Sequence, residues 1–142
     1  MDINIKKRIF VILIPLSGHI NPVAGIIQEL TSRNKNIEVT FYGIDEFKSL
    51  IIKTGAIYKK YFYDDMRLFE KKNIHKEKNS LLKLIKFQIH FTDKNIASLL
   101  RDVELEKPDF IIYDSVSFHT KYLIKLIHTR YEKKISMLIP PK

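Results

Sequence analysis

The 142-residue chain contains no cysteine. It can therefore form no disulfide, and it offers no thiolate as a nucleophile or as a ligand of zinc or an iron–sulfur cluster. The absence of cysteine is also compatible with a reducing compartment, and we expect a cytoplasmic protein. No apolar stretch approaches the roughly 20 residues that cross a bilayer, so we expect no membrane span.

Motifs of several common enzyme classes are also missing. The sequence has no G-x-G-x-x-G and no G-x-x-x-x-G-K-[ST], which removes the main reasons to expect a bound dinucleotide or nucleoside triphosphate. The G-x-S-x-G motif of α/β-hydrolases is absent as well. Four histidines match no familiar zinc spacing, and we expect no metal site. These are predicted to lie at the surface or at the edge of the core: His75, His90, His119 and His128.

The composition is that of one folded domain. Apolar residues make up 45% of the chain, with nine Phe and seven Tyr, which suffices for a core and excludes a disordered or low-complexity chain. The formal net charge is +9, which is typical of many nucleic-acid-binding proteins. The basic residues are scattered, and the one dense stretch, residues 71–86, contains Glu77 and is preceded by Glu70. We therefore expect a solvated surface and no nucleic-acid partner.

Predicted strands and helices alternate along the chain. Short apolar runs bounded by turn residues are predicted as strands at Arg8–Ile14, Ile37–Tyr42, Ala56–Phe62, Phe110–Tyr113 and Ile135–Ile139. Apolar residues at helical spacing predict helices at Asn21–Arg33, Asp45–Thr54, Ser80–Arg101 and Val116–Arg130. The alternation predicts an α/β fold, a parallel sheet with helices on both faces. Residues 63–79 are charged and aperiodic, which indicates an irregular segment or short helical pieces.

The first predicted helix begins at Asn21. This residue can cap free backbone N–H groups, and Pro22 suits a first helical position, where its missing N–H is harmless. The apolar face predicted to lie on the sheet consists of Val23, Ile26, Ile27 and Leu30. Gly55 is predicted to stop the second helix.

A candidate site follows from the strand order. If that order is 3-2-1-4-5, the first and fourth strands flank the point of reversal, where α/β sheets bind ligands beyond the strands' carboxyl ends. His19 and Asp114 follow these two strands. Gly18 is free to take a strained backbone angle that presents His19 near a helix N-terminus, where an imidazole tends to stay neutral and can act as a base. Parallel strands lie about 4.8 Å apart, so the carboxylate can reach and orient the imidazole.

A plainer interpretation remains open at this point. His19 then only caps a helix, and Asp114 only ends a strand.

Two blocks of the sequence resemble one enzyme family. The first is an ordered series: Gly18-His19-Ile20-Asn21-Pro22 after a hydrophobic strand, Ile37–Gly43, Glu46-Phe47 and Thr54-Gly55-Ala56. The second block is Pro108–Asp114. Together they resemble the amino-terminal half of the UDP-glycosyltransferases, especially the macrolide-glycosyltransferase-like branch.

The resemblance implies the amino-terminal half of a GT-B fold, in which two Rossmann-like domains face each other across a cleft. His19 matches the family's base, which deprotonates the acceptor hydroxyl, and Asp114 matches its carboxylate partner. The oxygen then attacks the anomeric carbon opposite the departing UDP, with inversion and without a metal. The UDP-sugar belongs to the other domain, so we expect no cofactor on this chain.

The resemblance also implies a small lipophilic acceptor on this half of the enzyme. The residues expected to contact it are Gly18, Asn21, Phe62, Phe87, Phe91 and Phe118. Core packing is the alternative for the last three phenylalanines. Base stacking on a nucleic acid is the alternative for the aromatic residues of the segment 58–69, although a strand with alternating side chains explains them more simply.

No residue of the sequence matches the family's donor domain. We therefore expect residues 1–142 to form a single, truncated acceptor-binding domain that lacks the groups needed to stabilise a departing diphosphate. Such a chain is inactive alone, or a partner chain that carries the donor domain completes it. The alternative is a non-catalytic remnant of the family that binds a small molecule or a protein.

Overall fold

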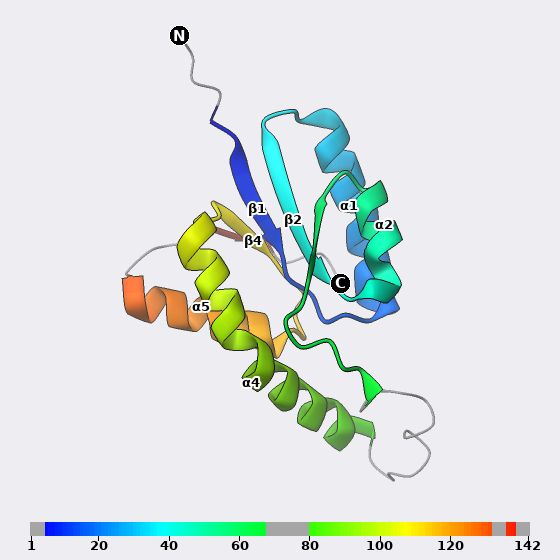
Figure 1. The fold of residues 1–142 in the computed structure, drawn as a ribbon, viewed down its shortest axis with the longest axis vertical. Helices are drawn as coiled ribbons and strands as arrows, with labels where there is room; N and C mark the ends of the chain where they lie inside the picture. Colours follow the sequence, from blue (N-terminus) through cyan, green and yellow to red (C-terminus); the bar gives the residue numbers. More distant parts are fainter. Residues whose placement is uncertain (1–4, 68–79, 132–135, 139–142) are drawn as a thin grey trace.

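The computed structural model describes residues 5–67, 80–131 and 136–138, whose strands form one five-stranded parallel sheet in the order β3-β2-β1-β4-β5. The strands are β1 (Lys7–Val11), β2 (Ile37–Gly43), β3 (Ile57–Lys60), β4 (Phe110–Ile112) and β5 (Ser136–Leu138). The helices are α1 (Ser17–Arg33), α2 (Lys48–Lys53) after the 3₁₀ turn η1 (Asp45–Phe47), α4 (Ser80–Glu106) and α5 (Phe118–Tyr131). This is the order on which the predicted site depends (Figure 1).

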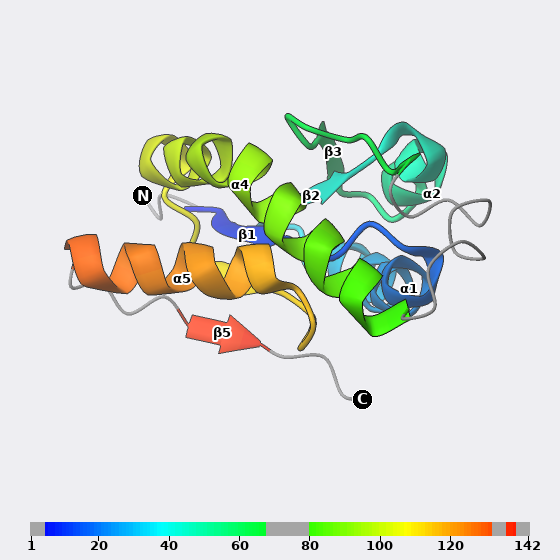
Figure 2. The same ribbon diagram turned by 90° about the horizontal axis from the view of Figure 1, so that it is seen from below.

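Helices cover both faces of the sheet, as predicted. In Figures 1 and 2, α1 and α2 lie on one face, and α4 and α5 lie on the other, where they pack against each other. The order follows from right-handed crossovers, because a chain that turns back from β3 to β4 must place its helix on the opposite face. The carboxyl ends of all five strands therefore point to one edge of the sheet.

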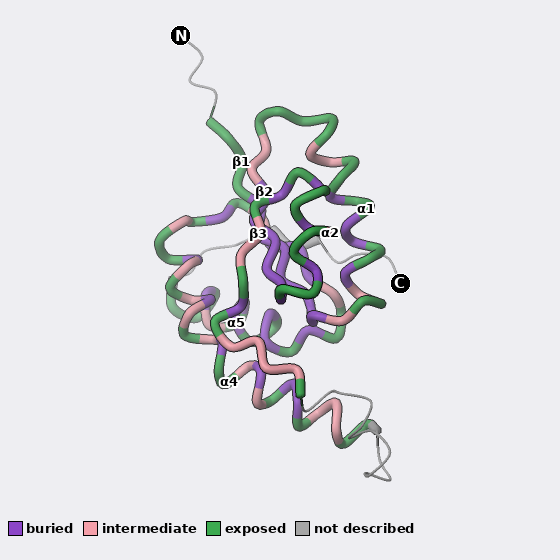
Figure 3. Tube along the Cα trace, turned by 45° about the vertical axis from the view of Figure 1, so that its right-hand side comes forward, coloured by how far each residue is buried: buried purple, intermediate pink, exposed green. Residues whose placement is uncertain are grey.

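The core lies along the central strand and continues past its end (Figure 3). β1 pairs with β2 and β4 on either side and stops at Val11, three residues before the predicted end. Its paired partners in β4 end at Ile112, so the chain leaves the ladder there. Residues 12–14 remain at most 1% exposed even so. The predicted strand therefore combines a paired strand and a buried loop that leads into α1.

The predicted start of α1 at Asn21 is wrong by one turn. The carbonyl of Leu16 accepts hydrogen bonds from the N–H groups of His19 and Ile20, both at 3.0 Å, so the helix begins at Ser17. Pro22 lies inside the helix, beyond its first turn, where it has no N–H to donate to the carbonyl of Gly18.

The apolar face of α1 also differs from the prediction at one position. Ile26 is 48% exposed, because the face on the sheet is centred on Val23 and Ile27, which are 3% and 0% exposed, and residue 26 falls on its flank.

Other helix boundaries shift for local reasons. α4 runs five residues beyond its predicted end, and α5 begins two residues later than predicted, because the side chain of Asp114 binds the backbone N–H of Val116 in a turn. Gly55 has a φ of +83° after the end of α2, which confirms its predicted role as a helix stop. Residues 63–66 have no regular structure, and residues 68–79 lie outside the described residues.

Candidate active site

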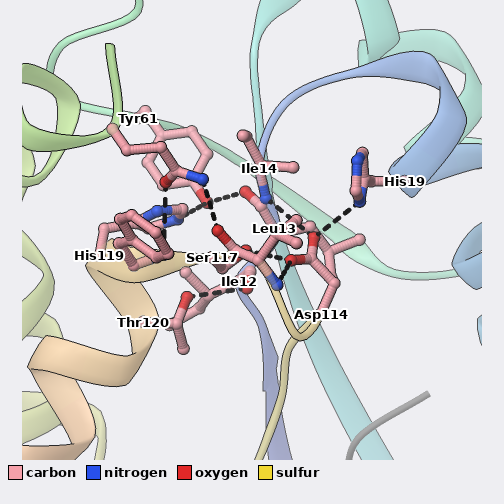
Figure 4. A network of polar contacts seen from close by, with 12 residues as sticks. Ile12, Leu13, Ile14, His19, Tyr61, Asp114, Ser117, His119 and Thr120 are labelled. Carbon is pink, nitrogen blue, oxygen red and sulfur yellow. Dashed lines mark hydrogen bonds and ion pairs between the residues drawn. The ribbon is translucent and has the colours of Figure 1, made fainter. Parts of the chain in front are cut away.

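His19 and Asp114 meet at the carboxyl edge of the sheet, with His19 Nδ1 3.3 Å from Asp114 Oδ2 (Figure 4). The imidazole projects from the first turn of α1, which follows β1, and the carboxylate follows β4. These two strands are hydrogen-bonded neighbours at the point where the strand order reverses. The topology therefore brings together two residues that are 95 positions apart in the sequence, by the subtraction 114 − 19.

The carboxylate of Asp114 is fixed by the protein's own donors. Its Oδ1 atom accepts hydrogen bonds from Val116 N at 3.0 Å and from the Ser117 hydroxyl at 2.8 Å. Its Oδ2 atom accepts one from Ile14 N at 3.3 Å, in addition to facing His19. With 12% of its side chain exposed, Asp114 has little freedom to turn away from the imidazole.

The contact also assigns the two nitrogen atoms of His19. Because Nδ1 faces a carboxylate oxygen, the neutral ring carries its proton on Nδ1 and leaves Nε2 free to accept one. The side chain is 34% exposed, so a ligand at this edge can reach the ring. The expected strained angle at Gly18 is wrong: this residue lies within α1, and Gly55 is the one described glycine with a positive φ.

Comparisons with known proteins find that the chain is similar to glycosyltransferases. No protein-family model matches the chain. Over 107 residues, or 75% of its length, the chain is 27% identical to a Bacillus subtilis (strain 168) protein described as an uncharacterized UDP-glucosyltransferase, YojK, of which it covers 26%. The chain resembles the UDP-glycosyltransferases.

Solved structures show the same fold. The chain matches the calicheamicin glycosyltransferase CalG4 with a TM-score of 0.71 at 18% identity, over 94% of this chain and 32% of that one. It matches the glycosyltransferase of kitacinnamycin with a TM-score of 0.69 at 16% identity, over 94% of this chain and 30% of that one. The UDP-glycosyltransferase-like chain thus has the Rossmann-like fold of GT-B enzymes and spans about a third of these proteins or less.

The residues expected to contact an acceptor fall into two groups. Gly18 and Asn21 are exposed on the first turns of α1, and Phe62 and Phe118 are 79% and 45% exposed. The other two belong to the core instead: Phe87 and Phe91 are 1% and 0% exposed.

The burial of Phe87 and Phe91 corrects their expected place in an open crevice. Their ring centroids lie 5.5 Å apart, and Phe91 also packs edge-on against Tyr61 at 4.9 Å. α4 turns these two positions toward the sheet, so the alternative of core packing describes them.

Phe62 protrudes between two residues that are held tightly. Tyr61 is 2% exposed and donates its hydroxyl proton to the carbonyl of Leu13 at 2.7 Å. The buried amide of Asn95, on α4, binds both backbone groups of Tyr63: its Oδ1 accepts from the N–H at 2.9 Å, and its Nδ2 donates to the carbonyl at 3.0 Å. The exposed ring of Phe62 therefore projects from a backbone whose neighbouring residues are held by hydrogen bonds.

His119 also lies in an environment that differs from the prediction. It is 0% exposed, against a prediction of the surface or the core edge, and its Nε2 lies 3.1 Å from the Tyr61 hydroxyl. The helical spacing of residues 119, 123 and 127 on the buried face of α5 is the signal that could have placed it. Of the other histidines, His90 is half-buried beside Tyr63 and His128 is exposed, while His75 lies outside the described residues.

The burial of His119 predicts a pH-dependent stability. Burial lowers its pKa to about 3, whereas an exposed imidazole titrates near 6.5. Between these values the unfolded chain binds a proton that the folded chain does not, so the free energy of unfolding falls as the pH drops below about 6.5, by at most ~1.4 kcal/mol per pH unit from this group. Urea denaturation between about pH 6.5 and pH 5 measures this slope.

The control for this slope is built into the chain. We expect the substitution His119→Leu to flatten the dependence of the unfolding free energy on pH. The substitution His128→Ala, at an exposed histidine, should leave it unchanged. Equal slopes in wild type and His119→Leu would contradict the assignment.

In the described part of the chain, no group of three or more histidine or acidic side chains is arranged to hold a metal ion. The described helices also include none that is both long and apolar enough to cross a membrane.

Proposed function

We propose that this chain is the acceptor side of a glycosyltransferase that moves a hexosyl group from a UDP-sugar to a hydroxyl group of a small lipophilic acceptor. The observation that carries the proposal is the 3.3 Å contact between His19 Nδ1 and Asp114 Oδ2 at the ligand-binding edge of the sheet. The glycosyltransferase names of the similar proteins support the reaction class.

In the proposed step, His19 acts as the base and Asp114 holds it in place. The acceptor hydroxyl gives its proton to Nε2 of His19 while its oxygen bonds to the anomeric carbon of the sugar. The bond from that carbon to the UDP oxygen breaks on the opposite face, so the configuration inverts and UDP leaves with the electron pair. The carboxylate stabilises the imidazolium that results, because its Oδ2 faces the protonated Nδ1.

The proposed acceptor contacts are the exposed residues near this edge. Gly18 and Asn21 border His19 on α1, and the phenylalanines Phe62 and Phe118 offer apolar area to a lipophilic compound. Ligand sites combine such apolar walls with a few polar groups, here the imidazole and the Asn21 amide.

We assign the binding of the UDP-sugar to residues outside this chain, in a donor-binding domain of a longer protein or of a partner chain. On this proposal residues 1–142 form one acceptor-binding domain that transfers no sugar alone, because stabilising the departing diphosphate is assigned to that other domain. We also propose a cytoplasmic location, which the absence of cysteine supports.

The first test uses the chain by itself. It is incubated with a panel of UDP-sugars and hydrophobic alcohols and phenols, and the products are analysed by mass spectrometry. We expect no transfer, together with perturbation of the NMR signals of His19 and Gly18 by the acceptors and not by the UDP-sugars. Sugar transfer by the chain alone would contradict the assignment of the donor site, and acceptors that leave both residues unperturbed would favour a non-catalytic remnant.

A further inference from the structure

Side chains from other elements hold the short buried segment 12–14 between β1 and α1 (Figure 4). The hydroxyl of Thr120, on α5, donates to the carbonyl of Ile12 at 3.0 Å. The hydroxyl of Tyr61, just after β3, donates to the carbonyl of Leu13 at 2.7 Å. Because this segment leads directly into the turn that carries His19, its position determines where the imidazole lies.

One peptide group of this segment is gripped at both ends. The carbonyl of Leu13 and the N–H of Ile14 belong to the same planar peptide unit, which turns as a rigid body. Tyr61 binds its oxygen, and Asp114 Oδ2 binds its N–H at 3.3 Å. Rotation of this plane would move the N–H away from Oδ2, the same oxygen that faces Nδ1 of His19.

The proton on Tyr61 fixes the state of His119. The tyrosine hydroxyl has one proton and lies near two groups, the Leu13 carbonyl at 2.7 Å and His119 Nε2 at 3.1 Å. A carbonyl oxygen can only accept, so the proton points to Leu13, and Nε2 of His119 must then donate to the tyrosine oxygen. His119 Nδ1 is left without a proton, in agreement with its having no hydrogen-bond partner in its buried position.

Burial keeps this arrangement constant. It lowers the pKa of His119 to about 3 and raises the pKa of the Tyr61 hydroxyl well above its ordinary value. The two rings pack edge-on with centroids 5.7 Å apart, and both are buried. Neither group changes its protonation between about pH 5 and pH 8.

We propose that Tyr61 is a positioning residue for the His19–Asp114 pair, acting through the Leu13–Ile14 peptide group and oriented by the Nε2–H tautomer of His119. The inference rests on the proposed role of His19. Its test reads the state of the histidine rings in this chain, so it gives an answer whether or not the chain takes part in sugar transfer.

The first measurement needs no substitution. Long-range ¹H–¹⁵N NMR spectra of the wild-type chain report which ring nitrogen of each histidine carries a proton. We expect His119 to show a protonated Nε2 and a bare Nδ1 without change between about pH 5 and pH 8, and neutral His19 to show a protonated Nδ1. A protonated Nδ1 on His119, or titration of its ring in that range, would overturn the proposal.

The second measurement compares two matched substitutions. Tyr61→Phe removes the hydroxyl that holds Leu13. Tyr63→Phe removes a hydroxyl that lies 3.0 Å from Nε2 of another histidine, His90, on α4. We expect Tyr61→Phe to lower the ratio of the Nδ1–H to the Nε2–H tautomer of His19 by about fivefold, the order expected from the loss of one buried hydrogen bond. Tyr63→Phe should leave the ratio unchanged.

A purely structural role for Tyr61 would lower the melting temperature and leave the His19 tautomers as in wild type, which would refute the proposal. If Tyr61→Phe fails to fold, a second pair of variants, at His119, tests the proposal. His119→Gln retains an N–H donor for the tyrosine oxygen and is expected to keep the wild-type His19 tautomer ratio, whereas His119→Leu removes the donor and is expected to shift it. Equal ratios in these two variants would also refute the proposal.

Discussion

Replacing His19 with alanine is expected to lower kcat for sugar transfer by about 10³-fold in a complete enzyme that contains this chain, within the range of 10²–10⁴ for a general base. The loss follows because the substitution removes the proposed base, the imidazole that Asp114 Oδ2 faces at 3.3 Å. The KM for the UDP-sugar should stay the same, because the imidazole is assigned to the acceptor. Steady-state kinetics with varied donor and acceptor separate these effects.

The matched control for this substitution is His128→Ala. His128 is an exposed histidine in the last turn of α5, so the same chemical change is made away from the site. Circular dichroism should show wild-type helix content in both variants, since the His19 side chain is 34% exposed and fills no core position. A His19→Ala enzyme that turns over at the wild-type rate would remove this residue from the mechanism.

The substitution Asp114→Asn is expected to lower kcat by about 10²-fold and to cost about 1–3 kcal/mol of unfolding free energy. An amide places an NH₂ group where Oδ2 now faces two N–H donors, those of Ile14 and His19. Turning the amide over restores that acceptor and sets the NH₂ against the N–H of Val116. Either orientation leaves a donor unpaired and weakens the alignment of the imidazole.

The substitution Asp109→Asn is a control that separates the effect of Asp114→Asn on stability from its effect on kcat. Asp109 precedes β4 at its other end, and its Oδ2 accepts a hydrogen bond from the backbone N–H of Arg8 in β1 at 2.9 Å. An asparagine keeps one oxygen that can accept this N–H but loses the charge that faces the Lys7 ammonium at 4.0 Å, so a small loss of stability, measured by urea denaturation, is expected without a change in kcat. If Asp114→Asn likewise lost stability and kept its full turnover, the carboxylate would have a structural role only.

The sequence alone was enough to predict the layers and the pairing of His19 with Asp114. Buried parallel strands are continuous apolar runs, and the order of such strands determines which loops are neighbours. Boundaries were less predictable, because they depend on tertiary contacts. Asn21 and Pro22 are strong local signals for a helix start, yet the helix begins a turn earlier at a backbone carbonyl, that of Leu16, which no side-chain pattern reveals.

The contact between Tyr61 and His119 beside the site could not be predicted either, because it also depends on tertiary packing. Tyr61 and His119 are 58 residues apart, and they meet because the end of β3 lies beside the first turn of α5 in the folded chain. The residue type alone does not place a histidine, because histidines are intermediate between core and surface residues. The spacing of residues 119, 123 and 127 indicates the buried face of α5, but only the packed structure shows that the His119 ring lies against Tyr61, and it likewise places Phe87 and Phe91 in the core.

The fixed backbone on both sides of Phe62 has a consequence for ligand affinity. Ordering a loose residue on binding costs about 1–2 kcal/mol of conformational entropy per backbone position. Here the bonds of Tyr61 to Leu13 and of Asn95 to Tyr63 have already removed that freedom in the unliganded chain. A compound that stacks on the Phe62 ring meets a preorganised surface, and its affinity should depend on ring contact far more than on loop closure.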